Sequence, residues 1–449
     1  MLDWLFPMLR EASPGVLARL AVCGVALCLL AADALVGAHF FSPPADALVG
    51  AHFSAPSAVR AGTEAAVPEQ TRALWVTRAT LSSPDAIGQM VRVAEASGFN
   101  TLFVQVRGRG DAYFTSSLEP RATELASKPD FDPLKTTLDQ AHAAGLKVHA
   151  WVAVNLVSSA ASLPASRDHV VYRAPEWLMV PRELVAEMKK ADPRSPAYVG
   201  RLARWTRAHA ADVEGLYTSP LHPAAQAHTV AVIGELARNY AIDGVHLDDV
   251  RYPNEGFDYS ASALEQFKAA VFPELTDLER REATAREALD PIAYPNLFRD
   301  QWNDFRRARL TALVTKIHAA VKAARPGAIV SAGVIPDAQH ALDARLQDWR
   351  GWMDRSIIDV LCPMAYTAEA SVFQQQVAAA TEYAGRRPVW AGIGAYRLTS
   401  AQTLQQIAAA TTIGTAGIIL FSYDALIAPP NNAGTLSELG RAAFGARSH

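Results

Sequence analysis

The sequence predicts an α/β protein built as a (β/α)8 TIM barrel with long insertions after its third and fourth strands. Three observations support this expectation. Apolar runs alternate with amphipathic segments from about residue 72 onward, eight runs can be counted, and the two longest gaps follow runs three and four. Eight strand–helix units within a chain of 449 residues leave room for a barrel whose extra length lies in its loops.

The eight predicted strands are short apolar runs. In chain order they lie at 73–78, 101–108, 147–157, 244–249, 328–336, 358–366, 388–396 and 416–424. The strands of a parallel sheet that is buried on both faces are apolar along their whole length, and these runs are nearly so. We therefore expect a parallel sheet that is covered on its outside by helices.

The segments between the runs have helical periodicity. Clear examples are 85–99, 134–146, 311–324 and 400–414, where apolar residues recur every three or four positions and a glycine often follows. A doubly wound open sheet is the rival fold. It would need a glycine-rich phosphate turn that opens a helix, and the stretch after the second strand, 106–114, opens none.

Two long insertions follow the third and fourth strands, at about 156–222 and 250–300. Both start at the carboxyl ends of strands, the face on which barrel active sites are built. Their larger aromatic residues are Trp177, Trp205, Tyr252, Phe257, Tyr259 and Trp302. Such side chains either stack on sugar rings or pack the insertion against the barrel.

The N-terminal region differs in composition from the rest. Arg10 and Arg19 precede a 13-residue apolar core at 20–32, so residues 1–38 resemble a secretory signal, with an uncleaved membrane anchor as the competing interpretation. A tandem repeat (ADALVGAHF) places small residues before cleavage points at Ala38 or Ala51, and we expect 39–70 to be a disordered linker. Residues 71–449 would form the barrel domain.

Composition narrows the possible partners. A formal net charge of −3 gives no basic field for nucleic acid. Only Cys362 lies outside the predicted signal, so neither a disulfide framework nor a cysteine zinc site is expected. We predict no cofactor, no metal and no obligate protein partner. Export without disulfides suits a periplasmic or secreted protein of a Gram-negative bacterium.

Two adjacent carboxylates, Asp248 and Asp249, end the fourth predicted strand. Neighbours in a strand point to opposite faces, so His246 and Asp248 can face the barrel mouth together, while Asp249 can bind backbone N–H groups or Arg251. Different surroundings separate the pKa values of two carboxyl groups, as acid–base chemistry requires. Glycosidic hydrolysis uses two such groups flanking the bond.

Further polar residues stand at the ends of other strands. The candidate catalytic residues are Asp248, Asp249, Asp111, Glu119 and Glu369. The candidate substrate-binding residues are Gln105, Arg107, His149, Trp151, Asn155, His246, Arg251, Tyr252, Tyr366 and Asp424, of which Asp424 is also a possible acid partner. Structural alternatives exist for three of these residue types. An aspartate can be a helix cap, an arginine can form a structural ion pair, and a histidine can be part of the buried core.

Several motifs in order resemble the glycosyl hydrolase-like 10 family, from about residue 72 to 424. They are ALWVTR (73–78), VQVRGRGDAYFTSSLEP (104–120), FDPLKTTLDQAHAAGLKVHAWV (131–152) and IDGVHLDDVRYP (242–253). The resemblance implies an exported bacterial barrel, of which some relatives cleave peptidoglycan glycan strands stripped of peptides. The matching signature positions are Gln105, Arg107, Gly110, Asp111, Ala112, Glu119, Pro120, His149, Ala150, Trp151, Asp243, Gly244, His246, Asp248 and Asp249. Related barrel families can carry tyrosine in place of Asp249, which favours Asp248 as the catalytic carboxylate.

The chain also departs from the family pattern. Ala153 stands where asparagine is usual, although Asn155 follows one pleat later, and Met364 and Thr367 replace a glutamine and a tryptophan after the sixth strand. The leading hypothesis is an exported glycoside hydrolase acting on a cell-wall glycan or related polysaccharide. The alternatives are a carbohydrate-binding barrel without turnover and a metal-dependent polysaccharide deacetylase or hydrolase using His149 and His246 with the two aspartates.

Overall fold

A computed structural model describes residues 69–445 of the chain. Eight parallel strands follow one another in the order β6-β5-β4-β3-β2-β1-β8-β7. Their bounds are β1 Thr71–Val76, β2 Thr101–Arg107, β3 Lys147–Ala153, β4 Gly244–Asp248, β5 Ile329–Val334, β6 Val360–Pro363, β7 Trp390–Ile393 and β8 Gly417–Phe421. Two isolated parallel bridges join β6 to β7, Leu361 with Val389 and Met364 with Gly392, and bring the two ends of the sheet together. The predicted TIM-barrel fold is confirmed.

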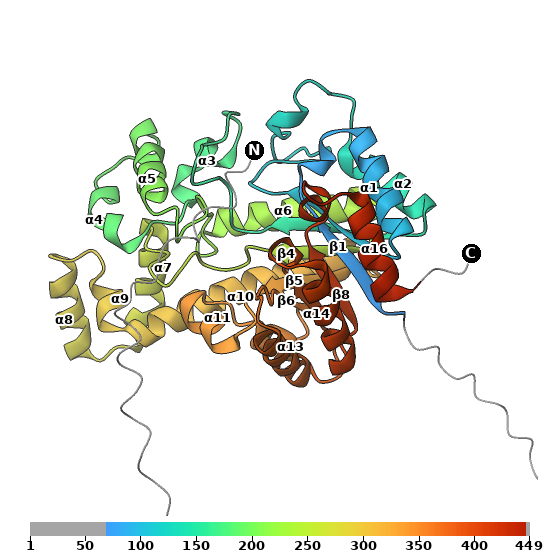
Figure 1. Ribbon diagram of the computed structural model, residues 1–449. Helices are drawn as coiled ribbons and strands as arrows, with labels where there is room; N and C mark the ends of the chain where they lie inside the picture. The colour runs from blue at the N-terminus through green and yellow to red at the C-terminus, as the bar shows by residue number, and fades with distance from the viewer. Residues whose placement is uncertain (1–68, 446–449) are drawn as a thin grey trace, which may run out of the picture. The chain divides into compact units, whose positions relative to one another are not determined.

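Helices cover the outside of the sheet (Figure 1). Those that follow the strands are α1 Pro84–Ala96, α2 Pro133–Ala143, α6 Pro223–Asn239, α10 Arg299–Ala324, α11 Ala338–Ala344, α12 Trp349–Asp354, α13 Ala370–Ala384, α14 Ser400–Ile413, α15 Tyr423–Ile427 and α16 Ala433–Phe444. Local sequence sets their ends. Ser83 caps α1 ahead of a proline in the first turn, and Gly414, in the left-handed region at φ 89°, ends α14.

The two predicted insertions carry short helices of their own. Between β3 and α6 lie α3 Val170–Arg173, α4 Val185–Met188 and α5 Pro196–Ala208. Between β4 and α10 lie α7 Ala261–Val271, α8 Asp277–Glu287 and α9 Ala293–Leu297. Figure 1 shows these helices gathered on one side of the barrel. Tyr252 and Trp302 are fully buried within this region, so both pack the insertion.

Two apolar clusters form the core. The larger one fills the space between the sheet and its helices, while a second cluster lies inside the barrel and includes Trp75, Phe103, Trp151 and Trp390. Both faces of every strand are therefore covered, which explains why the strands are apolar along their length. Several strands end three or four residues earlier than predicted; the sixth, for example, ends at Pro363, where the chain turns into the loop at the barrel mouth.

Candidate active site

The barrel interior is filled below its mouth. His149 stacks on Phe103 with 4.7 Å between ring centres, and the His246 ring lies 5.6 Å from that of Trp75. Burial lowers the pKa of both histidines to about 3, so both are neutral at physiological pH. Both residues face inward, as parity with Asp248 predicted for His246, and both form part of the core floor beneath the mouth.

Asp248 is the last residue of β4 and stands directly above this floor. Its Oδ2 accepts a hydrogen bond from the Trp151 indole N–H at 3.0 Å, and its Oδ1 accepts one from the Asp249 backbone N–H at 2.8 Å. Gly333 on β5 is its neighbour across the mouth, where a Cβ would make an ordinary contact with Oδ1 at 3.7 Å. The side chain is 18% exposed. Asp248 is therefore oriented by fixed donors and still open to a ligand.

Asp249 follows β4 and lies outside the strand, so its direction is set by its own backbone conformation and not by strand alternation. Its backbone adopts a left-handed conformation at φ 49°, and its buried carboxyl group lies 2.6 Å from Nη2 of Arg251. Burial raises the pKa of Asp249 well above its usual range, and the neighbouring carboxyl groups of Asp248 and Glu214 add to the shift against Arg251. Asp249 therefore holds a proton more readily than an ordinary aspartate does.

Glu214 is a third carboxyl group at this position. It lies in the insertion that follows β3, and its Oε1 is 3.5 Å from Nη2 of Arg251, whose Nη1 is 3.4 Å from Oδ1 of Asp248. The Tyr217 hydroxyl donates to its other oxygen at 2.7 Å. One guanidinium thus lies within 3.5 Å of both Asp248 and Glu214, and two carboxyl groups are what hydrolysis of a glycosidic bond requires.

Aromatic side chains surround the mouth beside Asp248. Tyr366 stacks on Phe421 with ring centres 5.6 Å apart, and Trp151 lies 6.2 Å from the same ring. Tyr396, in a 3-10 turn at Ala395–Arg397, is 38% exposed and 5.7 Å from Phe421. Burial raises the pKa of Tyr366 well above its usual range, with Asp248 adding to the shift, so its hydroxyl stays protonated. These rings form an apolar wall against which a sugar ring could pack.

Arg107 and Glu119 do not reach the mouth. A register shift in β2 between Gln105 and Arg107 breaks the alternation, so Arg107 pairs with Val152 rather than following Gln105 inward. Its Nε and Nη2 donate to Glu119 at 2.8 and 2.6 Å, and its Nη1 donates to the carbonyls of Ala153 and Val154. Both side chains are buried, which contradicts their predicted contact with substrate.

The pKa of Glu119 reflects this pairing. Burial acts to raise it, but the Arg107 guanidinium and the nearby His228 outweigh burial and lower it to about 2. A carboxylate that is fixed in its ionised form by a buried arginine cannot deliver a proton near neutral pH. The predicted acid role of Glu119 is therefore wrong on electrostatic as well as steric grounds.

The remaining predicted residues have diverse positions. Gln105 is half-buried at the end of β2, where its side-chain oxygen is 3.5 Å from the Arg78 backbone nitrogen. Asn155 is buried and donates to the Arg251 carbonyl at 3.3 Å, and the buried Tyr252 hydroxyl donates to the Arg306 carbonyl. Asp424 accepts from the Thr77 N–H and the Thr80 hydroxyl and so fixes the loop after β1. Tyr252 and Asp424 are thus structural, and Asn155 supports Arg251.

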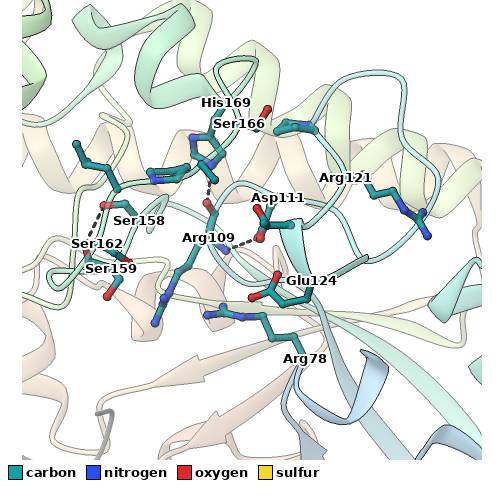
Figure 2. A pocket seen from close by; sticks show the side chains of 15 residues that line it. Arg78, Arg109, Asp111, Arg121, Glu124, Ser158, Ser159, Ser162, Ser166 and His169 are labelled. Carbon is teal, nitrogen blue, oxygen red and sulfur yellow. Dashed lines mark hydrogen bonds between the residues drawn. The ribbon is translucent and has the colours of Figure 1, made fainter. Parts of the chain in front are cut away.

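Asp111 and Glu369 lie in separate surroundings. Asp111 lines a polar cavity that is walled by the loops after β1, β2 and β3, and burial raises the pKa of its carboxyl group (Figure 2). Glu369 is exposed just before α13, and among the described residues its carboxylate forms no hydrogen bond or ion pair. Neither has a described contact with Asp248.

Glu214 is the residue that sequence reasoning missed. It lies within an irregular loop, 34 residues before Asp248, and no motif or periodicity marks it. Only the folded insertion brings it to Arg251. Over residues 69–445, no group of three His, Cys, Asp or Glu side chains is placed to hold a metal ion. No helix in that range is long and apolar enough to cross a membrane.

Comparison with known proteins places this geometry in context. A family model described as Glycosyl hydrolase-like 10 matches residues 70–406. The chain is 26% identical over 288 residues to glycosyl hydrolase DigH of Escherichia coli K12, covering 60% of this chain and 55% of that protein. It is 23% identical over 321 residues to glycosyl hydrolase YngK of Bacillus subtilis 168, covering 65% and 51%. The chain thus spans about half the length of these relatives.

Solved structures share the fold. The PgaB (BpsB) glycoside hydrolase domain of Bordetella bronchiseptica aligns with a TM-score of 0.56 at 17% identity, over 83% of this chain and 99% of that one. The catalytic domain of a β-amylase from Paenibacillus polymyxa aligns with a TM-score of 0.55 at 14% identity, over 85% and 100%. At these identities the likeness concerns the barrel itself.

Proposed function

Because this chain belongs to the glycosyl hydrolase-like 10 family, we propose that it is a glycoside hydrolase whose chemistry is centred on Asp248. The observation that carries the proposal is the position of this carboxylate. It is oriented by the Trp151 indole, bordered by aromatic rings and partly exposed, with Glu214 one guanidinium away. Two carboxyl groups of unlike surroundings are the minimum set for cleaving a glycosidic bond.

The two carboxyl groups take different roles in this proposal. Asp248 acts as nucleophile or as the base that activates water, and the Trp151 and Asp249 N–H donors together with Arg251 hold its carboxyl group in place. Burial first, and then the neighbouring carboxyl groups of Asp248 and Glu214, raise the pKa of Asp249, which is hydrogen-bonded to Glu214. This pair holds the proton, and Glu214, 45% exposed, delivers it to the leaving oxygen.

For the substrate we propose a bacterial cell-wall glycan, in line with the resemblance of the strand-end motifs to a family that includes peptidoglycan-active members. The aromatic wall of Tyr366, Tyr396 and Phe421 supports a sugar ligand. The carboxylate–arginine cluster of Asp248, Asp249, Glu214 and Arg251 suits acid–base hydrolysis. The departures at Met364 and Thr367 lie next to Tyr366 and favour the alternative of a barrel that binds glycan without cleaving it.

The direct test uses the full chain and glycan strands stripped of peptides, with release of reducing ends as the readout. We expect product from the wild type and a rate lower by about 10²–10⁴-fold for Asp248→Asn. The matched control is Asp277→Asn, an 84% exposed aspartate on α8, which should keep wild-type activity. Glycan binding without product would support the non-catalytic alternative, and full activity of Asp248→Asn would remove this residue from the reaction.

Export is a separate proposal. The predicted signal at 1–38 and the linker at 39–70 lie outside the described residues, apart from the last two of the linker. We propose a periplasmic or secreted protein, with an uncleaved anchor as the alternative. Fractionation of the producing cells with N-terminal sequencing tests this, and a mature N-terminus after Ala38 or Ala51 is the expected result.

A further inference from the structure

We propose that the polar cavity beside the barrel mouth binds a carboxylate carried by the glycan, on the sugar next to the one cleaved at Asp248. The inference rests on the proposed function and adds a charge preference to it. The cavity has a volume of about 210 Å³. This is small against typical ligand pockets of roughly 300–1,000 Å³, so it suits one substituted sugar rather than a whole oligosaccharide.

Two guanidinium groups form the cationic side of the cavity. Arg78 follows β1 and Arg109 follows β2, and Figure 2 shows both side chains in the lower part of the cavity. Gly108 makes room for this arrangement, since a Cβ at that position would collide with the Arg78 guanidinium. Burial, together with the nearby charge of Arg78, lowers the pKa of Arg109 to about 10. An anion between the two would relieve that repulsion.

Two carboxyl groups, Asp111 and Glu124, also line the cavity. Arg121 lines it as well, but its guanidinium donates to the backbone carbonyls of Leu125, Lys128 and Phe131, none of which lines the cavity. Arg78 and Arg109 therefore supply the guanidinium groups of the site. Burial raises the pKa of Asp111, which weakens the negative charge that these two arginines meet.

The two carboxyl groups also select among anions. The Tyr113 hydroxyl bonds to Glu124, and the Arg109 backbone N–H donates to Asp111 at 3.2 Å, so both acids are fixed in the wall. A dianion such as a phosphate monoester would meet stronger repulsion from them than a monoanion would. Arginine pairs bind planar carboxylates through parallel hydrogen bonds. A carboxylate is therefore the best match for the site.

The opposite wall is rich in hydroxyl groups and is joined to the catalytic cluster. It contains Ser158, Ser159, Ser162, Ser166 and His169. The Ala160 N–H donates to the Glu214 carbonyl at 2.8 Å, and Leu216 N–H donates to the Ser158 hydroxyl at 3.0 Å. The segment that carries Glu214 is thus hydrogen-bonded directly to the cavity wall. In the proposed arrangement, a glycan cleaved between Asp248 and Glu214 extends along this segment and places an adjoining sugar at the cavity.

The test measures binding apart from turnover. Full-length Asp248→Asn protein is titrated calorimetrically with a carboxylate-bearing cell-wall oligosaccharide and with the same oligosaccharide after reduction of its carboxyl groups. We expect the charged ligand to bind at least about tenfold more tightly than the reduced ligand, which corresponds to one good charge-assisted contact. Adding Arg78→Gln or Arg109→Gln should remove this preference and leave affinity for the reduced ligand unchanged.

Controls separate the site from general electrostatics and from folding. Arg355→Gln removes an exposed arginine at the end of α12 and should keep the preference. Arg109→Lys keeps the charge but loses the paired donors, so it should retain part of the preference, and thermal melting verifies that each variant is folded. Equal affinity for both ligands, or equal loss of both in the arginine variants, would overturn the inference. Hydrolysis of both ligands at equal rates would also overturn the inference, but the proposed glycoside hydrolase function would still stand.

Discussion

Two arginine–carboxylate clusters stand at the carboxyl ends of β2 and β4 and differ in the balance of their charges. Arg107 is fully occupied by one carboxylate, Glu119, and by backbone carbonyls, and the cluster is sealed from solvent. Arg251 meets three carboxyl groups, Asp248, Asp249 and Glu214. Two of the three reach the surface, with side chains 18% and 45% exposed.

The difference separates structure from chemistry. A matched buried pair fixes each partner in its charged form, so the pKa of Glu119 falls to about 2. A surplus of carboxyl groups around one guanidinium does the opposite, because burial and the neighbouring acids raise the pKa of Asp249. Identical residue types therefore give a structural anchor at β2 and a proton-holding site at β4.

The largest effect is expected at the sealed cluster of Arg107 and Glu119. Glu119→Gln leaves the Arg107 charge buried without a carboxylate, so we expect the free energy of unfolding to fall by about 3–5 kcal/mol. Denaturant unfolding measures it, and the activity of the folded fraction should be unchanged. Glu282→Gln is the matched control, because this exposed glutamate pairs with Arg286 on the surface of α8 and its loss should cost under about 1 kcal/mol. If the variant loses activity but keeps its stability, Glu119 belongs to the active site after all.

At the Arg251 cluster, Glu214→Gln should lower the rate of glycan cleavage by about 10²-fold, because the proposed proton donor is lost. Stability should change little, since Glu214 is exposed. Glu183→Gln, a change at another exposed insertion glutamate that accepts from the Trp205 indole, should keep the wild-type rate. An unaltered rate at every pH would assign the acid role elsewhere.

Acid titration probes the two buried histidines, His149 and His246, that lie beneath the Arg251 cluster. The folded-state pKa values of His149 and His246 are lowered from 6.5 to about 3, so the unfolded chain binds protons first as pH falls. Stability is therefore fully present above pH 6.5 and declines toward pH 3, by at most about 1.4 kcal/mol per pH unit for each histidine. Denaturant midpoints over this range should show a shallower slope for His246→Gln. An unchanged slope would mean that His246 does not stay neutral in the folded protein.

The smallest expected effect concerns the aromatic wall. Tyr396→Ala removes the exposed ring at the mouth, and we expect KM to rise about fivefold with kcat nearly unchanged, the worth of one aromatic contact. Steady-state kinetics on the same glycan measures both constants. Tyr172→Ala offers a matched control, since this tyrosine packs under Arg167 in the first insertion. A fall in kcat instead would show that Tyr396 positions the reacting sugar.

Local pattern was enough for the barrel. The eight apolar runs, the helical periodicity between them and the two long gaps are all properties of short stretches, and they predicted the strands and the insertions. Alternation along β4 placed His246 and Asp248 on the side of the barrel mouth, whereas Asp249 lies beyond the strand in a left-handed conformation and meets the same arginine, Arg251, as Asp248.

The pairing of charges was decided only in three dimensions. A single register shift in β2 turned Arg107 away from the mouth and joined it to Glu119, which no alternation rule anticipates. Glu214 came to Arg251 through a folded insertion, so its role has no trace in its own neighbourhood of the sequence. Periodicity is set by neighbours along the chain and survives without a structure, whereas a pKa depends on which charges and how much solvent surround a group in space.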